Sequence, residues 1–124
     1  MVGGRIKVLA ESMRDEVTGL RHHFHRHPET AWGEVGTSDK IEALLREWGF
    51  ENIRRGFRGT RSGVVADLNA GGEGPSIALR ADMDALAIKE ENPVPYASAH
   101  EGVMHACGHD AHMAILLGAG KILA

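Results

Sequence analysis

The feature that most constrains the fold of this chain is a dense polar cluster placed directly before its most apolar stretch. The cluster, residues 104–113, reads MHACGHDAHM and holds three histidines, one aspartate and the single cysteine of the sequence. The last residues, 111–124, are rich in alanine and glycine and apolar nearly all round, which predicts a helix buried against a sheet. The chain must therefore fold so that a buried helix presents polar groups at its N-terminal end.

Apolar residues spaced three and four apart predict two helices earlier in the chain. The first ends near His27, because the proline that follows disfavours helical geometry at that position. The second follows Thr37 or Ser38, either of which can cap it, and ends at Gly49, a residue suited to the position after a helix. Their apolar faces comprise Ile6, Leu9, Met13, Val17, Leu20 and Phe24 in the first helix and Ile41, Leu44, Leu45 and Trp48 in the second.

Histidines crowd the end of the first predicted helix, at positions 22, 23, 25 and 27. Protonated imidazoles suit the negative C-terminal end of a helix dipole, so we interpret these residues as a polar, exposed face. The alternative is a metal ion shared by His23 and His27, which stand four apart on one side of the helix.

Three β-type runs follow, at residues 52–55, 62–68 and 76–83. The glycine-rich loop at 69–75 is too short to hold a crossover helix, so the second and third runs are predicted to form an antiparallel hairpin. The predicted fold class is therefore α/β, with two N-terminal helices, a mixed sheet that contains the β-hairpin, and a buried C-terminal helix. A polar loop at 87–102 joins the last strand to the cluster, and we expect Glu90 in it to be solvated.

Two aspartates end the third run. Asp82 and Asp84 are two residues apart, so on an extended chain their carboxylates point to the same face. Such a pair is repulsive unless a cation, a proton or a donor lies between them. We interpret the pair as functional, the alternative being that one aspartate caps a turn.

The cluster itself offers metal ligands. A cysteine thiolate and a neutral imidazole bind Zn²⁺ and related ions, and in an extended stretch Cys107 and His109 could reach one ion or two adjacent ions. Asp110 then caps the final helix or binds metal, and His112 is exposed or supports a ligand. Two alternatives stay open from spacing alone: a nucleophilic Cys107 activated by His105 or His109, or an inert buried thiol.

Composition excludes several classes of function. A net charge of −3 with pI ≈ 6.2 gives no electrostatic case for nucleic acid or for an anionic membrane. A single cysteine cannot form an internal disulfide, which favours a reducing compartment. The N-terminal stretch lacks the long apolar region of a secretory signal, so we expect a cytoplasmic protein without a membrane partner.

Three motifs in order resemble one protein family. They are LRHHFHRHPETAWGE at 20–34, ALRADMDALAI at 78–88 and PYASAHEGVMHACGHDAHMAILLGAGKIL at 95–123. Together they resemble the start of an M20-type metallopeptidase of the amidohydrolase branch, which includes hippurate hydrolases, N-acyl-amino-acid amidohydrolases and auxin-conjugate hydrolases. Residues 1–124 are then expected to be the N-terminal portion of the catalytic domain.

The resemblance implies a site with two divalent ions, Mn²⁺ or Zn²⁺. Cys107 and His109 match two of the family's metal ligands, and Asp84 matches an aspartate that supports a ligand without binding metal. Asp82 stands where other branches carry a histidine ligand, so we do not expect it to bind metal in the same way. The implied reaction is hydrolysis of the amide bond of an N-acyl amino acid by metal-activated water.

The resemblance also implies parts that residues 1–124 do not contain. These are a glutamate pair, two further histidine ligands and a lid domain that mediates homodimer formation. We therefore expect this chain to be a fragment that is inactive alone and can be metal-free. The alternatives are a non-catalytic metal-binding or interaction module and a thiol hydrolase that uses Cys107.

Overall fold

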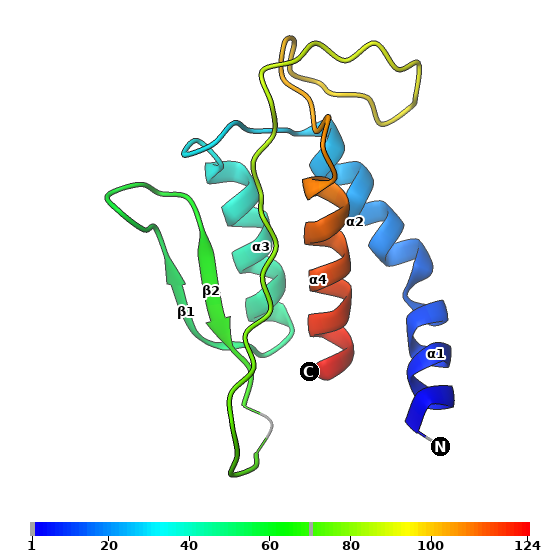
Figure 1. The fold of residues 1–124 in the computed structure, drawn as a ribbon, viewed down its shortest axis with the longest axis vertical. Coiled ribbons are helices and arrows are strands. Elements are labelled where there is room, and N and C mark those ends of the chain that lie inside the picture. The colour runs from blue at the N-terminus through cyan, green and yellow to red at the C-terminus, as the bar shows by residue number, and fades with distance from the viewer. Residues whose placement is uncertain (1, 70) are drawn as a thin grey trace.

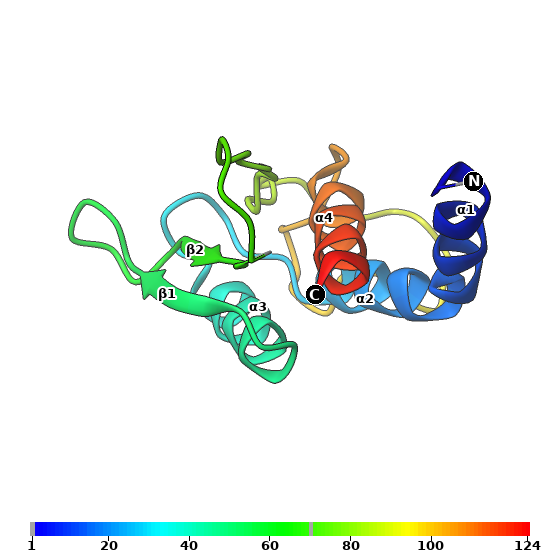
Figure 2. The same ribbon diagram turned by 90° about the horizontal axis from the view of Figure 1, so that it is seen from below.

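The computed structural model describes residues 2–69 and 71–124, and Figure 1 shows their arrangement. In chain order the elements are α1 (Val2–Ser12), α2 (Arg14–Arg26), α3 (Val35–Glu47), β1 (Glu51–Arg55), β2 (Val64–Asp67) and α4 (His109–Leu123). In both views α4 lies between α2 and α3 (Figures 1 and 2). The α/β class and the C-terminal helix are confirmed. Among the described residues no helix is long and apolar enough to cross a membrane.

The predicted first helix is two helices that break at Met13. The backbone N–H of Met13 still donates to the carbonyls of Leu9 and Ala10, at 3.2 and 3.3 Å. The two helices also differ in burial, because α2 buries Leu20 and Phe24 whereas Ile6 of α1 is half exposed. The predicted end is confirmed, since α2 stops at Arg26 with His27 as its C-terminal cap residue.

The predicted cap of α3 is wrong. The helix begins at Val35, so Thr37 and Ser38 lie inside its first turn. Glu29, from the preceding loop, accepts the backbone N–H groups of Gly36 and Thr37 at 3.0 and 2.7 Å. A carboxylate outside the helix therefore satisfies the free donors that a capping residue would take.

The predicted strand pairing is also wrong. The described sheet is a two-stranded antiparallel hairpin of β1 and β2, in which Arg54 pairs with Val65. Residues 76–83, all of them described, are not assigned to a strand, and Ile77 in this segment is 85% exposed. Only Ala81 and Met83, at the end of this segment, pack against the core, so its exposed first half gains little from pairing with β2. Residue 70 of the predicted turn lies outside the described residues.

The core lies where α2, α3 and α4 meet. Its buried apolar side chains are Leu20, Phe24, Ile41, Met113, Ala114 and Leu117. Helices α2 and α4 approach closely at Gly118, where an added Cβ would lie 2.6 Å from Cγ2 of Val17. The small residues of the final helix thus permit tight packing, as its composition predicts.

Candidate metal centre

The two motif segments meet at the N-terminal end of α4. Leu86 exchanges backbone hydrogen bonds with Met104, with N–O distances of 2.9 and 3.0 Å, and the N–H of Ala85 donates to the carbonyl of Glu29 at 2.8 Å. These bonds hold the end of the 76–83 segment beside the start of α4. The two aspartates of the sequence motif are thereby brought to the cluster.

His109 is the first residue of α4, and Asp84 holds its ring. Nδ1 of His109 lies 3.0 Å from both Oδ1 and the backbone oxygen of Asp84. Because both neighbours are acceptors, the ring proton belongs on Nδ1, which leaves the Nε2 lone pair available to a metal. Oδ2 of Asp82 lies 4.0 Å from that Nε2. The contact between Asp84 and Nδ1 of His109 is what a supporting role for Asp84 requires, and the role itself stays a prediction.

Cys107 lies in a bend just before α4 and is exposed. The predicted extended geometry from Cys107 to His109 is wrong, because the helix already begins at His109. Within residues 2–69 and 71–124, no three histidine, cysteine or carboxylate side chains converge as a metal cage. The chemistry of the donor set fits a divalent ion, but these residues supply only part of a coordination shell.

Asp110 does not cap α4 but bonds to side chains of α2. It is buried, and its Oδ2 accepts from Nδ1 of His25 at 2.8 Å and from Nε of Arg21 at 3.2 Å. The N-cap residue is Gly108, which has no side chain to offer. Asp110 therefore joins the start of α4 to α2, and the predicted cap is wrong.

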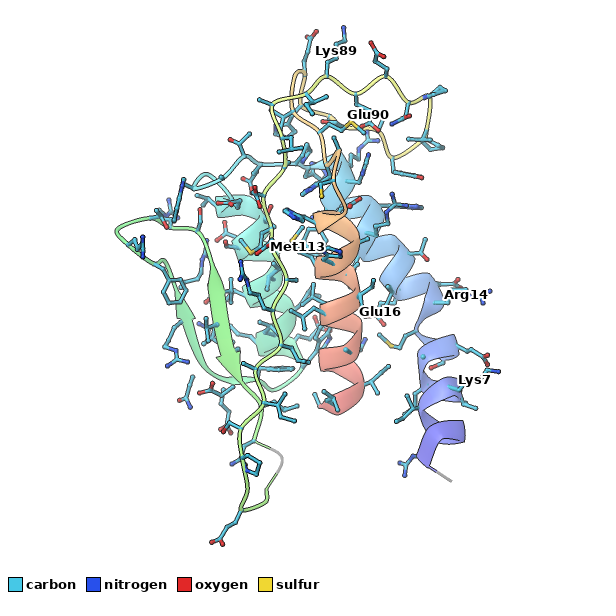
Figure 3. The ribbon with its side chains drawn as sticks, in the orientation of Figure 1. Lys7, Arg14, Glu16, Lys89, Glu90 and Met113 are labelled. Atoms are coloured by element: carbon cyan, nitrogen blue, oxygen red, sulfur yellow. The ribbon has the colours of Figure 1, made fainter. Side chains whose placement is uncertain are left out.

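A buried chain of polar contacts extends from Asp110 through His25 to Glu90. Nε2 of His25 lies 2.9 Å from Oε1 of Glu90, whose Oε2 accepts the backbone N–H of Ser98 at 2.5 Å. Burial alone would raise the pKa of Glu90, but the hydrogen bonds from His25, Ser98 and Asn92 outweigh it and leave that pKa lowered. The expectations of a solvated Glu90 and an exposed His25 are wrong, and Figure 3 shows Glu90 in the loop above the helices.

His105 is buried within the motif. Burial lowers its pKa, with Asp110 opposing this shift and His25 and His109 adding to it, so the imidazole is neutral near pH 7. Its Nε2 has no hydrogen-bond partner among the described residues. In the same part of the chain no hydrogen bond joins Cys107 to His105 or His109, so the geometry of an activated thiol is not assembled here.

His23 and His27 are exposed, as predicted, with ring centroids 4.9 Å apart. Together with His100 they line a hollow of about 300 Å³ beside the end of α2. Burial lowers the pKa of His23, and the charges of His27 and Lys40 lower it further. The donors of this trio do not converge on one point within the described residues.

Comparison with known sequences shows which proteins this chain is similar to. Residues 78–124 match the sequence model of peptidase family M20/M25/M40. The chain is 46% identical over 116 residues to N-acetyl-L-cysteine deacetylase of Bacillus subtilis, covering 94% of this chain and 27% of that protein. It is 42% identical over 122 residues to the N-acyl-L-amino acid amidohydrolase of Geobacillus stearothermophilus, covering 98% of this chain and 32% of that protein.

A solved structure agrees with these sequences. The crystal structure of a Bacillus subtilis dinuclear metal-binding peptidase from the M20 family superposes with a TM-score of 0.83 at 39% identity, covering 91% of this chain and 31% of that one. Fold and sequence are thus similar to those of M20 peptidases and amidohydrolases. Residues 78–124 carry that family's sequence, and the expected resemblance is confirmed. The chain spans about 30% of the length of the relatives it matches.

Proposed function

We propose that residues 1–124 form part of the catalytic domain of a metal-dependent amidohydrolase that cleaves the amide bond of N-acyl amino acids. The observation that carries this proposal is His109, oriented by Asp84 at 3.0 Å within the segment that matches the M20 family. The names of the relatives support the substrate class, since they are a deacetylase and an amidohydrolase of N-acylated amino acids. The single cysteine favours the reducing cytoplasm as the compartment.

In this proposal Cys107 and His109 hold metal in a centre of two divalent ions, either Mn²⁺ or Zn²⁺. When bound, such ions lower the pKa of water and polarise the amide carbonyl. His109 offers Nε2 while its Nδ1–H donates to Asp84, which fixes the tautomer and the orientation of the ring. Cys107 is exposed at the same helix end, where its sulfur is accessible to a metal ion.

A working centre requires more ligands than these two. About three protein ligands for each ion and a general base are needed, and we expect them from sequence outside residues 1–124, together with a lid that forms a homodimer. The 124-residue chain alone is therefore expected to be inactive.

The test begins with the DNA that follows codon 124. An in-frame glutamate pair and two histidines would allow expression of a longer chain, for which we expect Mn²⁺- or Zn²⁺-dependent hydrolysis of N-acetyl amino acids. His109→Ala and Cys107→Ser should each abolish that activity. Turnover by the 124-residue chain alone would contradict the need for further residues, and metal-free activity that Cys107→Ser removes would instead support a thiol hydrolase.

A second candidate is a non-catalytic interaction module, which the exposed segment 76–83 favours. Ile77 and Leu79 in it are 85% and 58% exposed, and an unpaired, apolar extended segment is a template for strand addition. This candidate predicts self-association of the isolated chain, which sedimentation measurements can detect and Leu79→Lys should weaken. A monomeric chain with a sharp cooperative melt would argue against it.

A further inference from the structure

His25 of α2 lies between two carboxylates that belong to different segments. Its Nδ1 is 2.8 Å from Oδ2 of Asp110 in the first turn of α4, and its Nε2 is 2.9 Å from Oε1 of Glu90 in the preceding loop. The side chains of these three residues are 6%, 2% and 4% exposed. We call the two hydrogen bonds the His25 contacts. They join the start of α4 and the loop to α2, away from bulk water.

The two partners determine the protonation of the ring. Asp110 also accepts from Nε of Arg21 at 3.2 Å, and a neighbouring guanidinium favours the ionised carboxylate. Hydrogen bonds lower the pKa of Glu90 despite its burial, so Glu90 is ionised near pH 7 as well. An ionised carboxylate only accepts, so both ring nitrogens of His25 donate and the ring is an imidazolium.

The charges around the ring balance when it is an imidazolium. The two carboxylates then face two cations, His25 and Arg21. Two further titratable groups lie near the ring: His105, which burial keeps neutral by lowering its pKa, and Tyr96, whose ring is edge-on at 5.5 Å. A neutral His25 would leave a buried carboxylate facing a nitrogen lone pair, and a buried charge without a partner is costly.

The first turn of α4 has no local cap to fix it. Its N-cap residue is Gly108, and Asp110, the acidic residue of that turn, bonds to α2 and not to its own backbone. The first core residue of the helix is Met113, one turn further on. The position of His109, at the start of the helix, therefore depends on the side-chain contacts that its neighbours make.

The second carboxylate, Glu90, holds the loop that leads into the cluster. It accepts from His25 through Oε1 and from the backbone N–H of Ser98, eight residues on, through Oε2 at 2.5 Å. Two parts of the loop are thus tied to α2 through one ring. The loop rejoins the fold at Met104, which bonds to Leu86 three residues before the cysteine.

We propose that His25 is a positioning residue for the candidate metal centre. As an imidazolium it holds, through Asp110, the first turn of α4 that carries His109. Through Glu90 it holds the loop that precedes Cys107. The role toward the metal rests on the proposed function, whereas the His25 contacts themselves do not.

The ring protons of His25 test the contacts directly. In the isotope-labelled 124-residue chain, NMR at pH 7 should show a proton on both Nδ1 and Nε2 of this ring. Glu90→Gln should leave one ring proton, because the new amide can donate to Nε2 while Nδ1–H still donates to Asp110. A single ring proton in the unaltered chain would overturn the proposal, and this result needs no variant.

Amide hydrogen exchange tests the positioning. A glutamine cannot donate in both directions, so His25→Gln should speed exchange at His112 in the first turn of α4 and at Ser98 by at least about tenfold, since the lost bonds are to charged groups. Exchange at Leu117, further along α4, should not change, which distinguishes a local release from a general loss of stability. His23→Gln is the matched control, because His23 lies on the same helix and its side chain makes no hydrogen bond among the described residues.

The variant Glu90→Gln separates the two contacts. It should speed exchange at Ser98 but leave His112 protected, because the ring still donates to Asp110. A folded His25→Gln chain with unchanged exchange at His112 would overturn the positioning role. Equal acceleration at His112 and Leu117 would also overturn it, because His25 would then only stabilise the fold.

The link to the metal is measured separately, by calorimetry with Zn²⁺. His25→Gln should weaken Zn²⁺ binding by at least about tenfold although it removes no ligand, while His23→Gln should leave the affinity unchanged. Equal affinity of the His25→Gln and unaltered chains would overturn the role toward the metal. A chain that binds no Zn²⁺ in any form would count against the proposed function and that role together, whereas the ring protons and the exchange at His112 decide the His25 contacts.

Discussion

The α2–α4 helix pair and the extended segment 76–83 flank the same candidate site, yet they are held in opposite ways. The helix pair contributes Phe24 and Met113 to the core, at 1% and 2% exposure, and is joined by the buried His25–Asp110 contact. The segment exposes Ile77 and Leu79 in its first half, packs Ala81 and Met83 against the core in its second half, and is followed by Ala85 and Leu86, which bond to neighbouring loops. The imidazole side of the site is therefore built on the helix core, whereas the carboxylate side follows a segment whose first half is exposed and whose end is held by partial packing and backbone hydrogen bonds.

The largest effect expected from this contrast comes from truncating one apolar residue on each side. Phe24→Ala should destabilise the chain by about 3–5 kcal/mol, because it leaves a cavity in the packed helix layer. Ile77→Ala should change stability by less than about 0.5 kcal/mol, because that side chain is already in water. Urea unfolding measures both, and similar losses for the two variants would show that the segment is packed as firmly as the helices.

A smaller effect is expected from two glycines of the helix pair. Gly118→Ala should cost about 1–3 kcal/mol, because its Cβ would lie 2.6 Å from Cγ2 of Val17. Gly19→Ala in α2 is the matched control: nothing lies within 4 Å of its added Cβ, so it should stabilise by up to about 1 kcal/mol. Thermal melts compare them, and opposite signs are required if α2 and α4 pack as described.

The mildest prediction concerns the acid side of the stability profile. The pKa of Glu90 is lowered from 4.5 in the folded state, so its ionised form stabilises the fold above that value and the contribution is lost as pH falls through the folded pKa. Glu90→Gln should lower the melting temperature at pH 7. It should also make the decrease of the melting temperature with falling pH less steep below about pH 4.5. Glu101→Gln, with an 88% exposed side chain in the same loop region, is the control. A profile of Glu90→Gln parallel to that of the unaltered chain would refute this role.

Local signals in the sequence predicted the helices well. Pro28 marks the end of α2, Gly49 has the positive φ of a residue after a helix, and the Ala/Gly-rich ending predicts a tightly packed α4. These features depend on a few adjacent residues, so the local sequence is enough to predict them. The proximity of Asp84 to His109 follows from a motif and not from spacing, since 25 positions separate them.

Contacts between residues far apart in the sequence could not be predicted from such local signals. Strand pairing depends on which apolar faces find partners, and the expected pairing of 62–68 with 76–83 did not form. The contact of His25 with Glu90 joins residues 65 positions apart, and both had been expected in solvent. An exposed and a buried ionisable residue look alike in sequence until the partner is known. The one available signal was the helical position of His25, directly beside the core residue Phe24.

The central claim is that Cys107 and His109 supply part of a metal centre at the start of α4. Titration calorimetry with Zn²⁺ or Mn²⁺ on the 124-residue chain tests it most directly, with His112→Ala as the control at an exposed neighbouring histidine. The account predicts that Cys107→Ser and His109→Ala each weaken metal binding by at least about tenfold while His112→Ala leaves it unchanged. Binding that survives unchanged in both ligand variants, or the same loss in all three, would contradict it.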